Sequence, residues 1–111
     1  MTRSNKNQEE LFDEYAYDWW NKTGNYKLLH KLNPLRLEYI TSRLDIRNKK
    51  ILDIGCGGGI LSEELSKMGA IVTGIDSSKK SINIAHKHAK EQDLDIEYIN
   101  GSILDLSLIH I

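Results

Sequence analysis

The sequence is short of several features that define broad protein classes. It contains one cysteine in 111 residues, so no disulfide can form within the chain and no cysteine cluster can hold a metal. This scarcity indicates a reducing compartment. No apolar run approaches the roughly 18 residues of a membrane-spanning helix, and no apolar segment follows Arg3 and Lys6 as it would in a secretory signal. We therefore expect a cytoplasmic protein.

The chain also lacks an excess of charge of either sign. Fifteen Lys and Arg residues stand against sixteen Asp and Glu residues, which gives a formal net charge of −1. Because nucleic acid selects strongly basic surfaces, this balance disfavours a nucleic-acid partner. A length of 111 residues with 40% hydrophobic residues suits one domain with a modest core.

The most informative stretch runs from residue 51 to residue 76. An apolar run, Ile51–Ile54, enters a glycine cluster, an amphipathic segment follows, and a second apolar run ends at Asp76. This order is typical of a β-α-β unit. It predicts an α/β protein with parallel strands near residues 50–55, 70–75 and 96–99.

The glycines in this stretch predict a cofactor site. Glycine has no Cβ, so Gly55, Gly57 and Gly59 can let a ligand lie directly against the backbone. Asp76 follows Gly55 by 21 residues, where a carboxylate can accept hydrogen bonds from both hydroxyls of a ribose. Asp53 adds a carboxylate that can meet a cofactor's ammonium group, although a solvated acid at a strand end is the alternative.

Two cofactor classes use such a unit, dinucleotides and S-adenosylmethionine. The dinucleotide fingerprint G-x-G-x-x-G would need glycine at position 60, where this chain has Ile60. A pyrophosphate would also be repelled by Asp53. The spacing therefore favours S-adenosylmethionine, with a dinucleotide oxidoreductase, or a glycine-rich turn that binds nothing, as the alternatives.

The cysteine and the histidines give weaker indications of a catalytic or metal site. Cys56 has no histidine near it in the sequence, so we expect a small loop residue and not a nucleophile. His86 and His88 lie two residues apart on an expected helix and point to different faces, whereas metal ligands on helices pair at i, i+4. We expect both to lie on the surface, expect the same of His30, and predict no metal site.

Three helices are expected after residue 30 from apolar periodicity. Asn33 reads as the N-cap and Pro34 as the first residue of one helix, which places Arg36 in the first turn, where a cofactor carboxylate or only solvent could face it. A second helix should stop at Gly69, and a third should span residues 78–92. The residues expected to face inward are Leu37, Ile40, Leu44, Leu61, Leu65, Met68, Ile82, Ala85 and Ala89.

Aromatic residues line the expected N-terminal helix, Gln8–Asn21. Leu11 or Phe12, Tyr15 and Trp19 recur about four residues apart, which is the spacing of one helix face. Such a stripe serves either packing or contact with a cofactor or substrate.

Several segments together resemble one known family. They are Trp19-Trp20, the run from Tyr26 to Ile40 (YKLLHKLNPLRLEYI), the run from Leu52 to Leu61 (LDIGCGGGIL), and residues 69–76. The chain is similar here to the ubiquinone biosynthesis O-methyltransferases, within the class I S-adenosylmethionine-dependent methyltransferases. The resemblance implies a Rossmann-like fold, S-adenosylmethionine contacts from Arg36, Gly55 and Asp76, and methylation of a polyprenyl catechol or demethylubiquinone hydroxyl.

The resemblance also implies what surrounds the site. Partners would be a lipid-like quinone precursor, the inner membrane through peripheral contact, and other proteins of ubiquinone biosynthesis. The family continues well past this point, and residues 106–111 do not resemble its next strand. We therefore expect an N-terminal helical segment at residues 1–48 and, at 49–111, a partial cofactor domain truncated after the third strand, whose catalytic residues are unknown. The alternatives are another small-molecule methyltransferase or an inactive cofactor-binding fragment.

Overall fold

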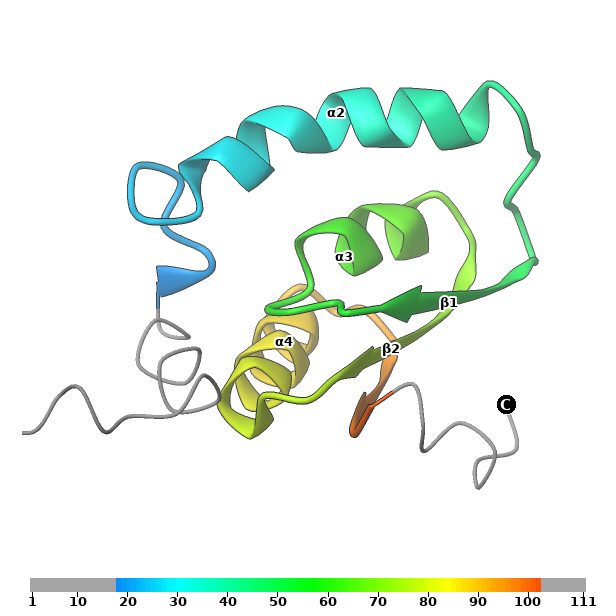
Figure 1. The fold of residues 1–111 in the computed structure, drawn as a ribbon. Coiled ribbons are helices and arrows are strands. Elements are labelled where there is room, and N and C mark those ends of the chain that lie inside the picture. The colour runs from blue at the N-terminus through cyan, green and yellow to red at the C-terminus, as the bar shows by residue number, and fades with distance from the viewer. Residues whose placement is uncertain (1–17, 103–111) are drawn as a thin grey trace, which may run out of the picture.

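The computed structural model describes residues 18–102. These residues form, in chain order, α2 (Lys27–Thr41), β1 (Lys50–Ile54), α3 (Ile60–Lys67), β2 (Ile71–Asp76), α4 (Lys79–Glu91) and β3 (Glu97–Asn100) (Figure 1).

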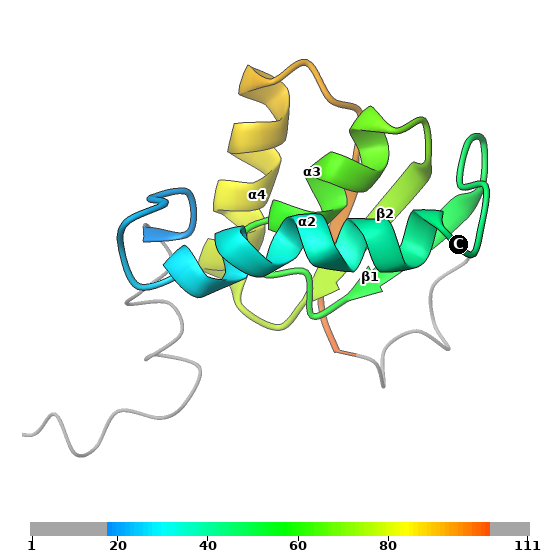
Figure 2. The same cartoon turned by 90° about the horizontal axis from the view of Figure 1, so that it is seen from above.

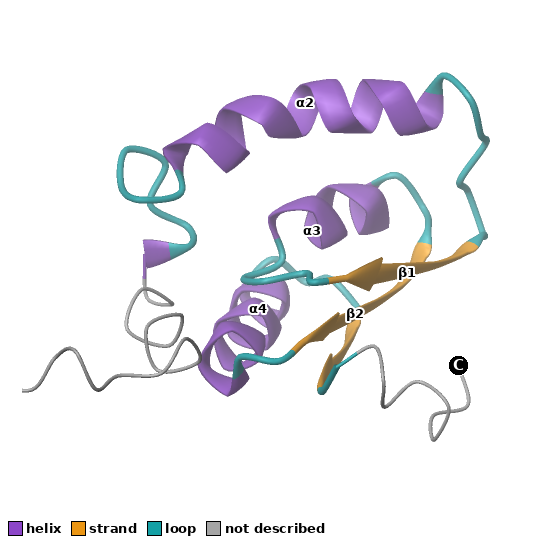
Figure 3. Cartoon of the chain, viewed as in Figure 1, coloured by secondary structure: helices purple, strands orange, loops and turns teal. Residues whose placement is uncertain are grey.

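The three strands form one parallel sheet in the order β1-β2-β3 (Figure 3). Asp53 lies in register with Gly74, and Asp76 with Asn100. Parallel neighbours need a crossover connection, and α3 and α4 supply it. The predicted α/β sheet is confirmed, with each strand within one residue of its expected bounds. Among the described residues, the outer edge of β1 pairs with no strand.

The helices are layered on the sheet. Figure 1 shows α3 between α2 and the sheet, and the view from above shows α2 crossing over α3 (Figure 2). Leu37 of α2, Leu65 of α3 and Val72 of β2 meet in the core. The inward positions Ile82, Ala85 and Ala89 of α4 are buried as predicted. The remaining members of the main core cluster are Ile46, Ala70, Ala89 and Ile96.

Two helix ends follow their sequence signals. Gly69 has φ of 95°, a left-handed conformation that favours glycine, and its N–H donates to the carbonyl of Ser66 at 2.9 Å. At the start of α4, the Ser78 hydroxyl accepts the N–H of Ser81 at 3.2 Å, which caps the helix.

The predicted start of α2 was wrong. The helix begins at Lys27, and Pro34 lies in its interior, although proline cannot donate the usual bond to the carbonyl four residues earlier. Asn33 is not a cap, because its side chain is buried and its Nδ2 donates to the Ile60 carbonyl at 3.2 Å. Contact with α3 therefore outweighs the local signal of the Asn-Pro pair.

Other expectations fail at helix ends. Leu44 and Met68 are 64% and 41% exposed, because α2 ends at Thr41 and α3 at Lys67, so the helical period no longer applies to them. Leu11, Phe12 and Tyr15 lie outside the described residues. The described part of the expected N-terminal helix, residues 18–21, is not α-helical: residue 18 lies in a 3₁₀ turn, and residues 19 and 20 form a turn.

Candidate functional site

The turn between β1 and α3 has the backbone that its glycines predict. Gly55, Gly57 and Gly59 have φ of 73°, 56° and 91°, all in the region that side chains disfavour. The N–H groups of Gly55 and Cys56 donate to the Ile75 carbonyl at 2.8 and 3.0 Å. These bonds fix the turn at the carboxyl ends of β1 and β2.

The glycines differ in what surrounds them. A Cβ on Gly55 would meet no atom of the described residues within 4 Å, so these residues leave open space over Gly55. A Cβ on Gly57 would overlap the Trp19 indole, and one on Gly59 would overlap the Tyr98 hydroxyl. Of these three glycines, Gly55 presents a backbone that no described side chain covers, whereas Gly57 and Gly59 also accommodate protein side chains.

Asp76 is joined directly to the glycine turn. Its Oδ2 accepts the N–H of Gly57 at 2.9 Å, and its Oδ1 accepts the N–H of Ser78 at 2.9 Å. A carboxylate oxygen can accept more than one hydrogen bond, so each oxygen retains capacity for a ligand hydroxyl.

Asp53 lies on the neighbouring strand with its carboxylate partly buried. The Ser62 hydroxyl donates to Asp53 Oδ2 at 2.6 Å. Burial raises the pKa of Asp53, while the Ser62 bond and the positive charge of Arg36 oppose the shift. Arg36 itself is exposed on α2, and this electrostatic effect is what links it to the site.

Two tryptophans that precede α2 contact the glycine turn. Trp19 Nε1 donates to the Ser81 hydroxyl at 3.0 Å, and its ring stacks on Tyr26 with 3.9 Å between centroids. Trp20 Nε1 donates to the Gly58 carbonyl at 2.8 Å. The aromatic spacing left Trp19 either to packing or to ligand contact and could not identify Ser81 and Tyr26 as its partners. The adjacent tryptophans were the available signal.

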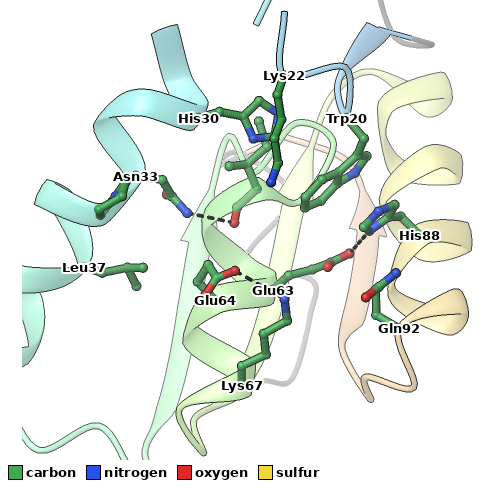
Figure 4. Close-up of a pocket in the computed structure, with 12 residues that line it drawn as sticks. Trp20, Lys22, His30, Asn33, Leu37, Glu63, Glu64, Lys67, His88 and Gln92 are labelled. Atoms are coloured by element: carbon green, nitrogen blue, oxygen red, sulfur yellow. Dashed lines mark hydrogen bonds and ion pairs between the residues drawn. The ribbon is translucent and has the colours of Figure 1, made fainter. Parts of the chain in front are cut away.

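His88 is not a surface residue, contrary to the prediction. Its Nδ1 lies 2.6 Å from Glu63 Oε2, and its ring stacks on Trp20 at 3.7 Å (Figure 4). Glu63 is fully buried, which raises the pKa of its carboxyl group, while the bond to His88 lowers it. These residues line a cavity of about 630 Å³ between α2, α3 and α4. An amphipathic helix pattern could not reveal the pair, because the partners lie on different helices.

The other two histidines and the cysteine are now placed. His86 is exposed as predicted, whereas His30 is half-buried and its Nε2 lies 2.8 Å from the Trp19 carbonyl oxygen. Cys56 is buried, and burial raises the pKa of its thiol, which disfavours the reactive thiolate.

Two kinds of feature are absent from residues 18–102. No three His, Cys, Asp or Glu side chains there gather in a way that could hold a metal ion. No helix among these residues is both long and apolar enough to cross a membrane.

Comparison with known proteins identifies the family. Residues 51–110 match the family model described as "Methyltransferase domain". The chain belongs to the methyltransferase domain family. Its fold is shared with the magnesium protoporphyrin IX methyltransferase of Synechocystis PCC 6803, solved with bound SAM, at 19% identity and a TM-score of 0.70 over 90% of this chain and 57% of that one.

Curated proteins resemble this methyltransferase domain more closely in sequence. The ubiquinone biosynthesis O-methyltransferase of Coxiella burnetii is 49% identical over 100 residues, covering 88% of this chain and 43% of that protein. The protein of the same name from Nitrosococcus oceani is 50% identical over 104 residues, covering 92% and 44%. The chain thus spans less than half the length of these relatives.

Proposed function

We propose that this chain binds S-adenosylmethionine at the carboxyl ends of β1 and β2. The observation that carries the proposal is the bond from the Gly57 N–H to Asp76 Oδ2, beside the open backbone of Gly55. It joins an acceptor for ribose hydroxyls to a surface that a ligand can approach closely. The residues proposed to hold the cofactor are Arg36, Asp53, Gly55, Gly57, Gly59 and Asp76.

Each of these residues has a proposed role in cofactor binding that suits its chemistry. Asp76 would accept hydrogen bonds from the ribose hydroxyls, while Asp53 and Arg36 would meet the ammonium and carboxylate of the methionine part. Gly55 would allow close approach, and Gly57 and Gly59 would shape the turn through their backbone. When bound, S-adenosylmethionine supplies a methyl group activated by a positively charged sulfonium.

We propose further that the protein acts in ubiquinone biosynthesis as an O-methyltransferase on a polyprenyl catechol or demethylubiquinone hydroxyl. The names of relatives about half identical to this chain support it. An apolar groove of about 420 Å³ on α2, lined by Leu32, Leu35, Arg36, Tyr39 and Ile40, suits a lipid-like acceptor. Such an acceptor resides in membranes, so the proposal includes a cytoplasmic protein in peripheral contact with the inner membrane and with other proteins of ubiquinone biosynthesis.

The cofactor class is tested by calorimetry. The purified chain is titrated with S-adenosylmethionine and, in parallel, with a nicotinamide dinucleotide. Binding of the first without the second supports the proposal. Binding of the dinucleotide alone, or of neither by a chain that circular dichroism shows to be folded, contradicts it.

A further inference from the structure

Trp20 contacts the glycine turn through its indole N–H. Trp20 Nε1 donates to the Gly58 carbonyl oxygen at 2.8 Å, although the two residues lie 38 positions apart in the sequence. The peptide group that contains this carbonyl also contains the Gly59 N–H, which donates to the Cys56 carbonyl oxygen at 3.1 Å. The peptide between Gly58 and Gly59 is therefore held at both its oxygen and its nitrogen.

A second peptide group continues from Cys56 to Asp76. The Cys56 carbonyl, which accepts the Gly59 N–H, belongs to the same planar unit as the Gly57 N–H. That N–H donates to Asp76 Oδ2 at 2.9 Å. Three hydrogen bonds thus run in one direction, from the Trp20 indole through two peptide groups to the Asp76 carboxylate.

Hydrogen bonds arranged in such a chain strengthen one another. Each donor polarises the peptide group that accepts its bond, and the N–H of that peptide group becomes a better donor to the next acceptor. Gly58 and Gly59 flank the first peptide group, and glycine adopts φ of either sign at little cost. Without a donor to the Gly58 carbonyl, this peptide group is therefore free to turn away from the Cys56 carbonyl.

Two histidines hold the Trp20 ring in place. The ring stacks on the His88 imidazole with 3.7 Å between centroids and 4° between the planes. The His30 ring lies at 62° to the Trp20 ring, with 5.6 Å between centroids. His88 in turn lies 2.6 Å from the buried carboxylate of Glu63 (Figure 4). The side chain that supplies the first donor of the chain is therefore fixed from α2 and from α4.

We infer that Trp20 is a positioning residue for the cofactor site, which acts on Asp76 through the Gly58–Gly59 and Cys56–Gly57 peptide groups. This role requires no contact between Trp20 and the cofactor. The inference rests on the proposed function, in which Asp76 accepts hydrogen bonds from the ribose hydroxyls. It extends the site to a residue that precedes α2.

Calorimetric titration of Trp20→Phe with S-adenosylhomocysteine tests the inference, because this variant keeps a ring beside His88 and removes the N–H donor. We expect it to bind about 5-fold more weakly than wild type, as the loss of one neutral hydrogen bond predicts. Thr41→Val is the matched control. It removes a side-chain donor from the Leu37 carbonyl, 2.9 Å away on α2, and should bind as the wild type does.

The outcomes of this titration separate the inference from the proposed function. If the wild-type chain binds and Trp20→Phe binds equally well, only the inference fails. If Thr41→Val is weakened as much as Trp20→Phe, the effect does not come from the bond to Gly58, and the inference fails as well. If the folded wild-type chain does not bind, the proposed function fails and the inference fails with it.

The chain of hydrogen bonds also has a spectroscopic signature that needs no ligand. Weaker hydrogen bonds move amide proton resonances upfield, so those of Gly57 and Gly59 should move upfield in Trp20→Phe. The Gly69 N–H, which donates to the Ser66 carbonyl at 2.9 Å, should keep its resonance. Resonances of Gly57 and Gly59 that match those of the wild type would overturn the inference.

A measurement on the wild-type chain covers the case in which Trp20→Phe does not fold. Coupling between two sites is reciprocal, so saturation with S-adenosylhomocysteine should move the resonance of the Trp20 indole N–H. The Gly69 amide resonance serves as the reference. A Trp20 indole resonance that moves no more than that of Gly69 in a chain saturated with ligand would overturn the inference.

Discussion

Glu63 on α3 and His88 on α4 form a carboxylate–imidazole pair in which the carboxylate is buried, with 2.6 Å between Oε2 and Nδ1. Glu63 is 0% exposed, and its second oxygen, Oε1, has no hydrogen-bond partner among residues 18–102. Trp20 also contacts the pair: its ring stacks on the His88 imidazole, and its Nε1–H donates to the Gly58 carbonyl. It therefore links two helices to the glycine turn.

Loss of His88 should destabilise the chain strongly. His88→Ala leaves the Glu63 carboxylate buried without its partner, and breaking a buried pair from one side costs about 3–5 kcal/mol. Urea unfolding measures the change in the free energy of unfolding. His86→Ala, at an exposed position of the same helix, should stay within about 0.5 kcal/mol of wild type. Equal stability of the two variants would show that the pair contributes nothing.

Asp53 should make stability depend on pH. Burial raises its pKa above the ordinary value of 3.8. In the pH window between 3.8 and the raised pKa, the folded chain therefore binds more protons than the unfolded chain. The free energy of unfolding should then fall as pH rises through the window. Asp53→Asn removes this contribution and keeps an oxygen that can accept the Ser62 hydroxyl.

Urea unfolding between about pH 4 and pH 7 tests this sign. Asp53→Asn should lose less stability than wild type as pH rises across that range. Asp95→Asn, at an exposed position before β3, controls for the loss of one charge. A steeper loss in Asp53→Asn than in wild type would contradict the direction of the shift.

Alanine at Gly55 and at Gly58 should have different effects. At Gly55 the cost is backbone strain of about 1–2 kcal/mol, because φ is 73° and the space is open, while cofactor binding should be lost. At Gly58 the new methyl group meets Trp19, so the destabilisation should largely disappear when Trp19 is also alanine. Thermal unfolding of Gly58→Ala, Trp19→Ala and the double variant checks this coupling; additive effects would contradict it.

Cys56 should react slowly with alkylating reagents. Its side chain is 7% exposed, and burial raises the pKa of its thiol, so little thiolate is available to react. Mass spectrometry after iodoacetamide treatment should show little modification of the folded chain and rapid modification in urea. Equal rates in the two conditions would mean that the glycine turn opens freely.

Local sequence signals predicted the parts of the molecule that depend on near neighbours. The strand–glycine–helix order located β1, α3 and β2, and Gly69 marked the end of α3, because these features depend on φ angles and on periodicity within one element. Gly57 and Asp76 come together because neighbouring parallel strands end at the same edge of the sheet.

Contacts between distant segments could not be predicted in the same way. The bond from Trp19 to Ser81 joins residues 62 apart in the sequence, and the Glu63–His88 pair joins residues 25 apart. A helical period indicates which face of α4 is buried but not which side chain it meets. The interior position of Pro34 could not be predicted for a similar reason. Asn33 contacts α3, and the local Asn-Pro sequence does not reveal that contact.

One calorimetric comparison decides whether Asp76 anchors a cofactor at the glycine turn. S-adenosylhomocysteine is titrated into the wild-type chain, Asp76→Ala and the control Asp95→Ala. Lost hydrogen bonds to a charged group should cost about 1.5–3 kcal/mol, so Asp76→Ala should bind at least about 10-fold more weakly, while Asp95→Ala binds as wild type does. Equal affinity of Asp76→Ala and wild type would show that Asp76 does not anchor the cofactor.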